Sequence, residues 1–297
     1  MEKEIDIPGG SLVFDIACGT ARLERITGNM TILDIPERLE NDEAGSDGVI
    51  VKSIIKKAVL GKKTIRKITV PDSVEYIGDW AFSGCSNLTH IKIPACSMGE
   101  GVLSGCRSLR VVDHPDLSKD KTGLFAGCIR WEAPTHLTDL DNAGDDWLEK
   151  FDAWVISLLQ SPDDEGFQNQ ILCGEEDYGS SDKGAYESRK RVMKASICME
   201  RLLNPEALGE KSSKMFSDYI YSHRAGARGG SESWYALRDE YPDKVHFDLL
   251  NSLGCIDDSN RDMMIRELGE DSGELKSLLV KSSGNDASDR FFSKFTL

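Results

Sequence analysis

Residues 70–94 read VPDSVEYIGDWAFSGCSNLTHIKIP, and parts of this pattern recur on both sides of the stretch. Six positions match the sequence 23 residues upstream: Ala58/Ala81, Gly61/Gly84, Ile65/Leu88, Ile68/Ile91, Val70/Ile93 and Pro71/Pro94. A third copy at residues 102–115 follows at a spacing of 21, and a partial fourth at residues 124–131 follows 22 later. Self-similarity at such a period predicts a solenoid, whose stacked coils bury one another's apolar edges.

Each copy predicts the same local structure. A short strand points its aliphatic residues inward and ends at Pro94, because proline cannot donate to a sheet. Phe82 belongs to the returning, more helical side of the coil. Gly84 stands where the coil turns back, so we expect a positive φ there. The inward residues of this strand are Leu88, Ile91 and Ile93.

These residues resemble the BspA-like class of bacterial leucine-rich repeats, which is marked by Ile-Gly-x-x-Ala-Phe-x-x-Cys followed by Leu-x-x-Ile-x-Ile-Pro. The resemblance covers about residues 28–134 and implies a curved solenoid with a parallel sheet on its concave side. It also implies an exported surface or adhesin-like role, which is common in the class. The third copy departs from the motif, with Gly101-Val102-Leu103 at the Gly/Ala/Phe positions and His114 at an inward aliphatic position.

After Pro134 the alternation of strands gives way to helical periodicity. We therefore predict an α/β leucine-rich-repeat solenoid with an N-terminal cap over residues 1–136, followed by an all-α domain over residues 137–297. Leucine pairs at 249–250 and 278–279 make this second domain weakly ankyrin-like. The expected helices are 145–160, 182–203, one opened by Pro205 and running to about 222, 231–240, 243–253, 259–268 and 273–281.

Charge and hydropathy exclude several classes of protein. The formal charge is 36 − 51 = −15, the wrong sign for a nucleic-acid or anionic-membrane binder. Residues 1–140 carry 17 − 20 = −3 and the remainder 19 − 31 = −12, so the helical half holds most of the acidity. No window reaches the ~18 apolar residues of a membrane span. Acidic residues occupy the position of a secretory signal, which predicts a cytoplasmic protein.

The eight cysteines show no CxxC pair and no zinc spacing with histidine. Cys85, Cys106 and Cys128 occupy one repeat position, so we expect them to be buried, reduced thiols. We predict no metal site and no cofactor. The carboxylate run at residues 174–179 lacks the alternate spacing of an EF-hand and is more simply a solvated loop.

No nucleophile elbow, phosphate-binding glycine loop or His-Glu-x-x-His pair is present, so we predict a protein that is not an enzyme. One alternative is an enzyme with a site at the junction of the two halves, lined by His136 or His223 with carboxylates. A basic stretch from Lys52 to Lys67 is more simply a set of outward positions, although it could dock an acidic partner or the acidic half of the chain.

The outward strand residues are the predicted binding site. With Ile91 inward, His90 and Lys92 face out, and stacking aligns them with the equivalent residues of neighbouring strands. The predicted partner-binding residues are Lys67, Thr69, His90, Lys92 and Asp113. We expect a protein or peptide partner, and the lysines favour an acidic segment. The predicted function is a non-catalytic interaction module or scaffold in the cytosol; the alternatives are the exported adhesin-type protein and the enzyme above.

Overall fold

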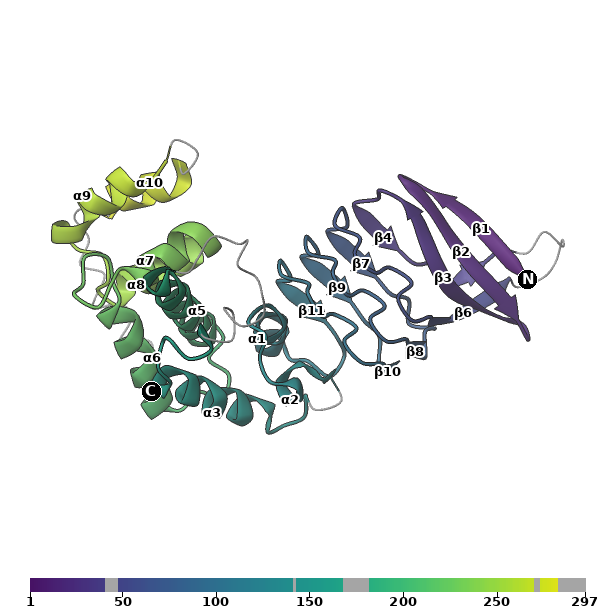
Figure 1. The fold of residues 1–297 in the computed structure, drawn as a ribbon, viewed down its shortest axis with the longest axis horizontal. Coiled ribbons are helices and arrows are strands. Elements are labelled where there is room, and N and C mark those ends of the chain that lie inside the picture. Colours follow the sequence, from purple (N-terminus) through teal and green to yellow (C-terminus); the bar gives the residue numbers. More distant parts are fainter. Residues whose placement is uncertain (41–47, 141–142, 168–181, 270–272, 283–297) are drawn as a thin grey trace. The chain divides into compact units, whose positions relative to one another are not determined.

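The computed structural model describes residues 1–40, 48–140, 143–167, 182–269 and 273–282. The chain divides into two compact units, Met1–Trp147 and Leu148–Leu297. The first is rich in strands and the second is helical (Figure 1). The division falls after the predicted boundary because Trp147 packs in the first unit, where its ring centroid lies 6.1 Å from that of Phe125. The Trp147 indole N–H also donates to the Leu137 carbonyl at 3.4 Å.

One sheet begins at the N-terminus and continues into the coils. Its antiparallel hairpins are β1 (Glu2–Ile7), β2 (Gly10–Ala17) and β3 (Thr20–Gly28). Positive φ angles at Gly9 and Gly19 allow the two tight turns between them. The sheet then adds β6 (Val49–Ile54), β8 (Tyr76–Ile77) and β10 (Ser97–Met98) in parallel, with β5 (Arg38–Leu39) antiparallel to β6.

The second sheet consists of one short strand from each coil. Its order is β11 (Val111–Asp113), β9 (His90–Lys92), β7 (Lys67–Thr69) and β4 (Ile32–Asp34), and all neighbours are parallel. Figure 1 shows these strands side by side along the first unit. The strand-rich repeat region predicted from the sequence is therefore present.

The coil interior follows the repeat pattern. Phe82 is buried, as are the strand residues Leu88, Ile91 and Ile93. The Cys85 thiol donates to the Val59 carbonyl at 3.2 Å and the Cys106 thiol to the Phe82 carbonyl at 3.4 Å, so each thiol bonds to the preceding coil. Burial raises the pKa of Cys85 to about 11 and that of Cys106 to about 12. The predicted burial of these thiols is confirmed.

The partial fourth copy of the motif, at residues 124–131, forms no strand. This stretch belongs to helix α1 (Lys119–Arg130), which carries the buried Cys128 and contacts β11. The Ser118 hydroxyl caps the helix by accepting from the Lys121 N–H at 3.4 Å. No Leu-x-x-Ile-x-Ile-Pro segment follows Cys128, so the stretch lacks the strand that makes a coil. A short helix, α2 (Thr135–Thr138), follows.

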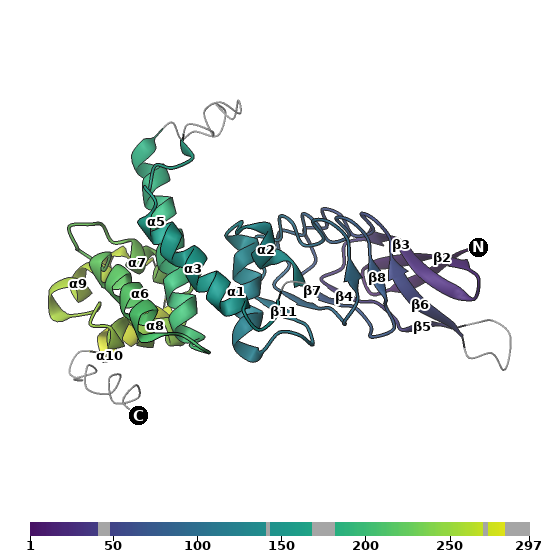
Figure 2. The ribbon, with the colours of Figure 1, turned by 90° about the horizontal axis from the view of Figure 1, so that it is seen from below.

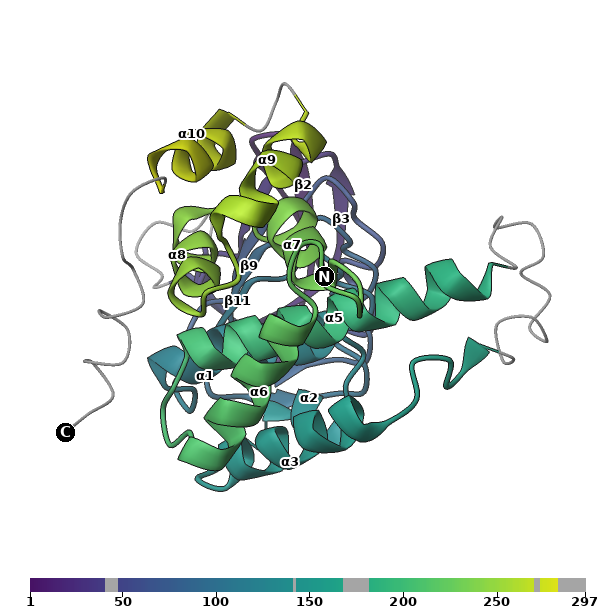
Figure 3. The ribbon, with the colours of Figure 1, turned by 90° about the vertical axis from the view of Figure 1, so that its left-hand side faces the viewer.

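The second unit is helical, as predicted (Figures 2 and 3). Its central helix α5 contacts α6, α7, the π-helical turn η3 and α8. The elements are α3 (Trp147–Gln160), α5 (Lys183–Leu203), α6 (Glu210–Ser222), α7 (Glu232–Tyr235), η3 (Ala236–Glu240), α8 (Lys244–Ser252), α9 (Asp258–Glu267) and α10 (Gly273–Lys281). Among the described residues, no helix is both long and apolar enough to cross a bilayer.

Helix α6 begins at Glu210 rather than Pro205, because Ala207 has a φ of 54° and Gly209 is extended. The two leucine pairs lie on α8 and α10, which contact each other. The ankyrin-like character of these helices stays a prediction.

Candidate functional site on the strand face

The outward side chains of the four parallel strands form one surface, which we call the strand face. Strand pairing aligns them in two rows. The first row is Ile32, Lys67, His90 and Val111, and the second is Asp34, Thr69, Lys92 and Asp113. At about 4.8 Å between strands, each row is about 14 Å long.

Buried residues between the rows hold this surface in place. The middle residue of each strand is buried against the coil interior, whereas the residues before and after it are exposed or half-buried. The middle residues are Leu33, Ile68, Ile91 and Val112. All five predicted partner-binding residues therefore share one surface, in the predicted rows. Their role in binding stays a prediction.

The strand face carries both signs of charge. The Lys92 ammonium lies 3.4 Å from the Asp72 carboxylate, and with these side chains 46% and 78% exposed the pair is weak. Asp34 and Asp113 stand at the two ends of the row that contains Lys92. In the other row, Nδ1 of His90 lies 3.0 Å from the Thr89 hydroxyl.

Sequence reasoning missed the contribution of β4 to this surface. Ile32 is 54% exposed and Asp34 is exposed, so the strand extends both rows by one residue. The signal was present, since residues 32–36 read ILDIP, close to the IKIP that ends the second copy. Because the insertion after residue 40 interrupts the period, this match at the strand end was not extended to the outward rows.

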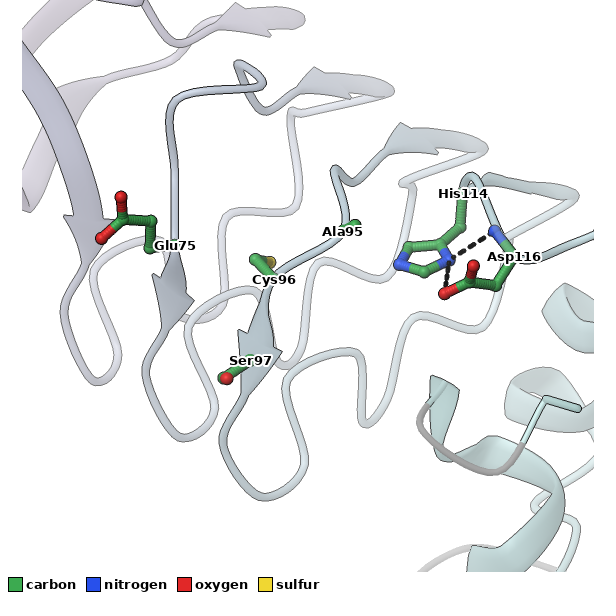
Figure 4. Close-up of a pocket in the computed structure, with 6 residues that line it drawn as sticks. All are labelled: Glu75, Ala95, Cys96, Ser97, His114 and Asp116. Carbon is green, nitrogen blue, oxygen red and sulfur yellow. Dashed lines mark hydrogen bonds and ion pairs between the residues drawn. The ribbon is translucent and has the colours of Figure 1, made fainter.

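A second surface feature is a shallow, open depression beside β10 (Figure 4). From Ile68 to Tyr76 the chain advances 76 − 68 = 8 residues, but from the paired Ile91 to Ser97 it advances only 97 − 91 = 6. The shorter connection leaves this coil without a counterpart to the buried Val74. The depression is lined by Glu75, Ala95, Cys96, Ser97, His114 and Asp116.

His114, which departs from the repeat motif, is buried at the edge of this depression. Its Nδ1 accepts from the Asp116 backbone N–H at 3.2 Å and lies 3.7 Å from the Asp116 carboxylate. The imidazole thus occupies an inward position where other coils place an aliphatic side chain.

The remaining candidate histidines belong to different units. His136 is exposed on α2 of the first unit, and His223 ends α6 of the second, with Nδ1 2.9 Å from the Tyr219 carbonyl. The carboxylate run at residues 174–179 lies outside the described residues. Within the described ranges, no group of three or more histidine, cysteine or acidic side chains is placed to hold a metal ion.

The basic stretch pairs with acids and an aromatic ring one coil further on. Lys52 bonds to Glu75, and the Lys56 ammonium lies 3.3 Å from Asp79. The Lys56 ammonium also lies 4.5 Å from the centroid of Trp80. These contacts connect successive coils; docking of the stretch onto an acidic partner or the acidic half stays a prediction.

Comparisons with known proteins agree with the repeat geometry. A family model described as the BspA type leucine-rich repeat region matches residues 52–151 in six copies. These residues are therefore a BspA-type leucine-rich repeat region, as their motifs indicated. A search of curated proteins finds no match.

Three solved structures are similar to part of the chain. A leucine-rich cell surface protein from Faecalibacterium prausnitzii is 22% identical, with a TM-score of 0.31 over 37% of this chain and 30% of its own. A leucine-rich repeat protein from T. pallidum is 23% identical, with a TM-score of 0.33 over 38% and 51%. One from Bacteroides capillosus is 26% identical, with a TM-score of 0.31 over 38% and 88%. The chain thus spans less than two thirds of the first two.

Proposed function

We propose that the BspA-type leucine-rich repeat region of this chain is a non-catalytic module that binds a protein or peptide on its strand face. Repeat regions of this class are generally binding modules. The observation that carries the proposal is the strand register, which places Lys67 beside His90 and Thr69 beside Lys92 on one surface.

The strand face suits binding because it is already ordered. Ile68 and Ile91 are buried and their strands pair in register. The backbone positions of the outward residues before and after them are therefore fixed. A partner then meets a preformed surface and loses little binding energy to ordering the backbone. An acidic segment of the partner would contact Lys67 and His90.

The size of the strand face limits the partner. With two rows about 14 Å long and about 7 Å apart, the strand face has a much smaller area than the ~800 Å² that each partner buries in a standard protein interface. We therefore propose a short segment of polypeptide as the ligand, either a peptide or one exposed loop of a larger protein. Neither nucleic acid nor a membrane is part of the proposal.

The proposed location is the cytosol, with export to the cell surface as the alternative. The exposed thiol of Cys18 supports a reducing compartment, because exposed free thiols are readily oxidised outside the cell. The name of the F. prausnitzii protein, which calls it a cell surface protein, favours the alternative. Immunodetection in separated cytosolic and surface fractions of the native cells decides between the two.

The test of binding uses the full chain with a photo-crosslinking amino acid in place of His90. The control carries it in place of Tyr76, a 44% exposed residue on β8 of the other sheet. After irradiation in native cell extract, the His90 variant should form a discrete crosslinked species that the Tyr76 variant does not form.

Charge reversal gives an independent measurement with the crosslinked protein. Lys67→Glu should weaken its binding, whereas Lys63→Glu should not, because Lys63 lies outside the strand face. Loss in Lys63→Glu alone would move the site to the turn of the coil. Loss in neither would remove the strand face from the binding model.

A further inference from the structure

We infer that the polypeptide segment recognised by the strand face is bipolar, with acidic residues at one end and basic residues at the other. The inference rests on the proposed function and adds the chemistry of the partner. It follows from how charges are distributed along the direction of the strands.

The amino ends of the strands carry positive charge. The residues that enter β7, β9 and β11 are Arg66, Thr89 and Arg110, and backbone bonds join them side by side. Thr89 N–H donates to the Arg66 carbonyl at 2.9 Å, and Arg110 N–H donates to the Thr89 carbonyl at 2.8 Å. Lys67 follows Arg66 and both are exposed. This edge, which we call the basic edge, holds the exposed Arg66 and Lys67, a formal charge of +2, beside the half-buried Arg110.

The carboxyl ends of the strands carry negative charge. Asp34 and Asp113 are the exposed last residues of β4 and β11. Asp72 follows β7 after two intervening residues and is 78% exposed. Lys92 is the exception, and its ammonium lies 3.4 Å from Asp72. This acidic edge therefore has a formal charge of −3 + 1 = −2.

The two edges are close enough to act on one ligand. The first and third residues of each strand are separated by about 7 Å, because a strand rises about 3.3 Å per residue. That is no more than the ~8 Å Debye length at physiological ionic strength. A segment lying across the strand face thus meets opposite potentials at its two ends.

This polarity selects among partners. A uniformly acidic segment is attracted by Lys67 and repelled by Asp34 and Asp113, so part of its binding energy cancels. A uniformly basic segment has the reverse problem. A segment with acidic and basic residues two to four positions apart is attracted at both edges. Like-charge repulsion at one edge disfavours the uniformly acidic segment and the uniformly basic segment.

The test is an NMR titration of the 15N-labelled full chain with three synthetic six-residue peptides at low salt. The first has two glutamates, two threonines and two lysines in that order; in the second all four charged positions are glutamate, and in the third all are lysine. The bipolar peptide should shift the strand-face amides, those of His90 and Asp113 among them, and bind about three- to tenfold more tightly than either other peptide.

One variant distinguishes a bipolar partner from a uniformly acidic one by the sign of its effect on binding. Asp113→Lys should weaken the bipolar peptide about threefold and strengthen the all-glutamate peptide. Asp6→Lys makes the same change in net charge on β1 of the other sheet and should change neither by more than a small amount. Lys67→Glu should weaken both peptides.

Three results would overturn the inference. They are all-glutamate binding as tight as bipolar binding, strengthening of the bipolar peptide by Asp113→Lys, and no shift of strand-face amides with the bipolar peptide. If any occurs while the crosslink at His90 is still formed, the binding function stands and only the bipolar chemistry of the partner is wrong.

Discussion

The coils of the first unit and the helices of the second bury different kinds of side chain. Apart from His114, the coil interior is built from aliphatic residues, Phe82 and thiols that donate to main-chain carbonyls. The helical unit buries charge: Arg201 is 0% and Lys194 1% exposed. Arg201 donates hydrogen bonds of 2.6 and 3.0 Å to the Asp152 carboxylate, and Lys194 donates one of 2.7 Å to the Asp163 carboxylate.

This difference shows what holds each unit in register. A coil repeats one local pattern, so each apolar residue meets its counterpart about 23 positions away. The helical unit also has an apolar core, but in addition it contains specific buried ion pairs between residues 49 and 31 positions apart. Such pairs add little net stability, but removing one partner is costly.

The largest loss of stability should come from a change in the apolar interior of the coils. Phe82→Ala leaves a cavity between neighbouring coils and should lower the free energy of unfolding of the first unit by about 3–5 kcal/mol. Hydrogen exchange of the β7 and β9 amides measures this loss. Leu60→Ala, at a 46% exposed position, is the control and should have a much smaller effect.

The corresponding variant in the helical unit is Arg201→Met. It leaves Asp152 in a mostly buried position without its partner and should cost about 3 kcal/mol in urea denaturation. Lys214→Met removes an exposed pair with Asp218 and should cost no more than about 0.5 kcal/mol. If the double variant Arg201→Met/Asp152→Leu is no more stable than Arg201→Met, the uncompensated carboxylate is not the cause.

A smaller, pH-dependent effect belongs to the helical unit alone. His246 stacks on Tyr241, with Nδ1 2.9 Å from Asp243 and Nε2 3.8 Å from Glu200. Burial alone would lower the pKa of His246, but the carboxylates of Glu200 and Asp243 outweigh it and raise the pKa above 6.5. Protonation therefore favours the folded state.

The sign of the pH effect follows from this raised pKa. The stabilisation is complete below the unfolded value near 6.5 and is lost as pH rises through the folded value. Urea denaturation followed by circular dichroism should show the free energy of unfolding of the helical unit falling over this pH window. His246→Gln should remove this pH dependence. The control, His136→Gln in the first unit, should keep it. A slope that survives in His246→Gln would assign the titration to another group.

The sequence could predict what the repeat determines. The burial of Cys85, Phe82 and Ile91 follows from matched positions, and so do the rows of the strand face. It could not predict α1, because residues 124–128 keep the coil motif while the strand that should follow is missing. Nor could it predict the burial of Arg201, since its partner Asp152 lies on another helix and no local pattern relates the two.

The smallest expected effect tests the inside and outside assignment of the coils. Lys63 is exposed at a coil turn, and we expect its side chain to contribute little to the stability of the coil. Its main-chain carbonyl accepts from the Asn87 side-chain amide of the next coil at 2.7 Å. Alanine keeps that carbonyl, so Lys63→Ala should stay within about 0.5 kcal/mol of wild type in hydrogen exchange of the β7 and β9 amides.

Asn87→Ala makes the complementary change, because it removes the donor and leaves the carbonyl to water. It should cost about 0.5–1.5 kcal/mol, the net contribution of one hydrogen bond, and more than Lys63→Ala. A cost for Lys63→Ala that approaches that of Phe82→Ala would contradict the coil assignment. A cost for Asn87→Ala no greater than that of Lys63→Ala would show that apolar contacts, and not this bond between turns, set the spacing of the coils.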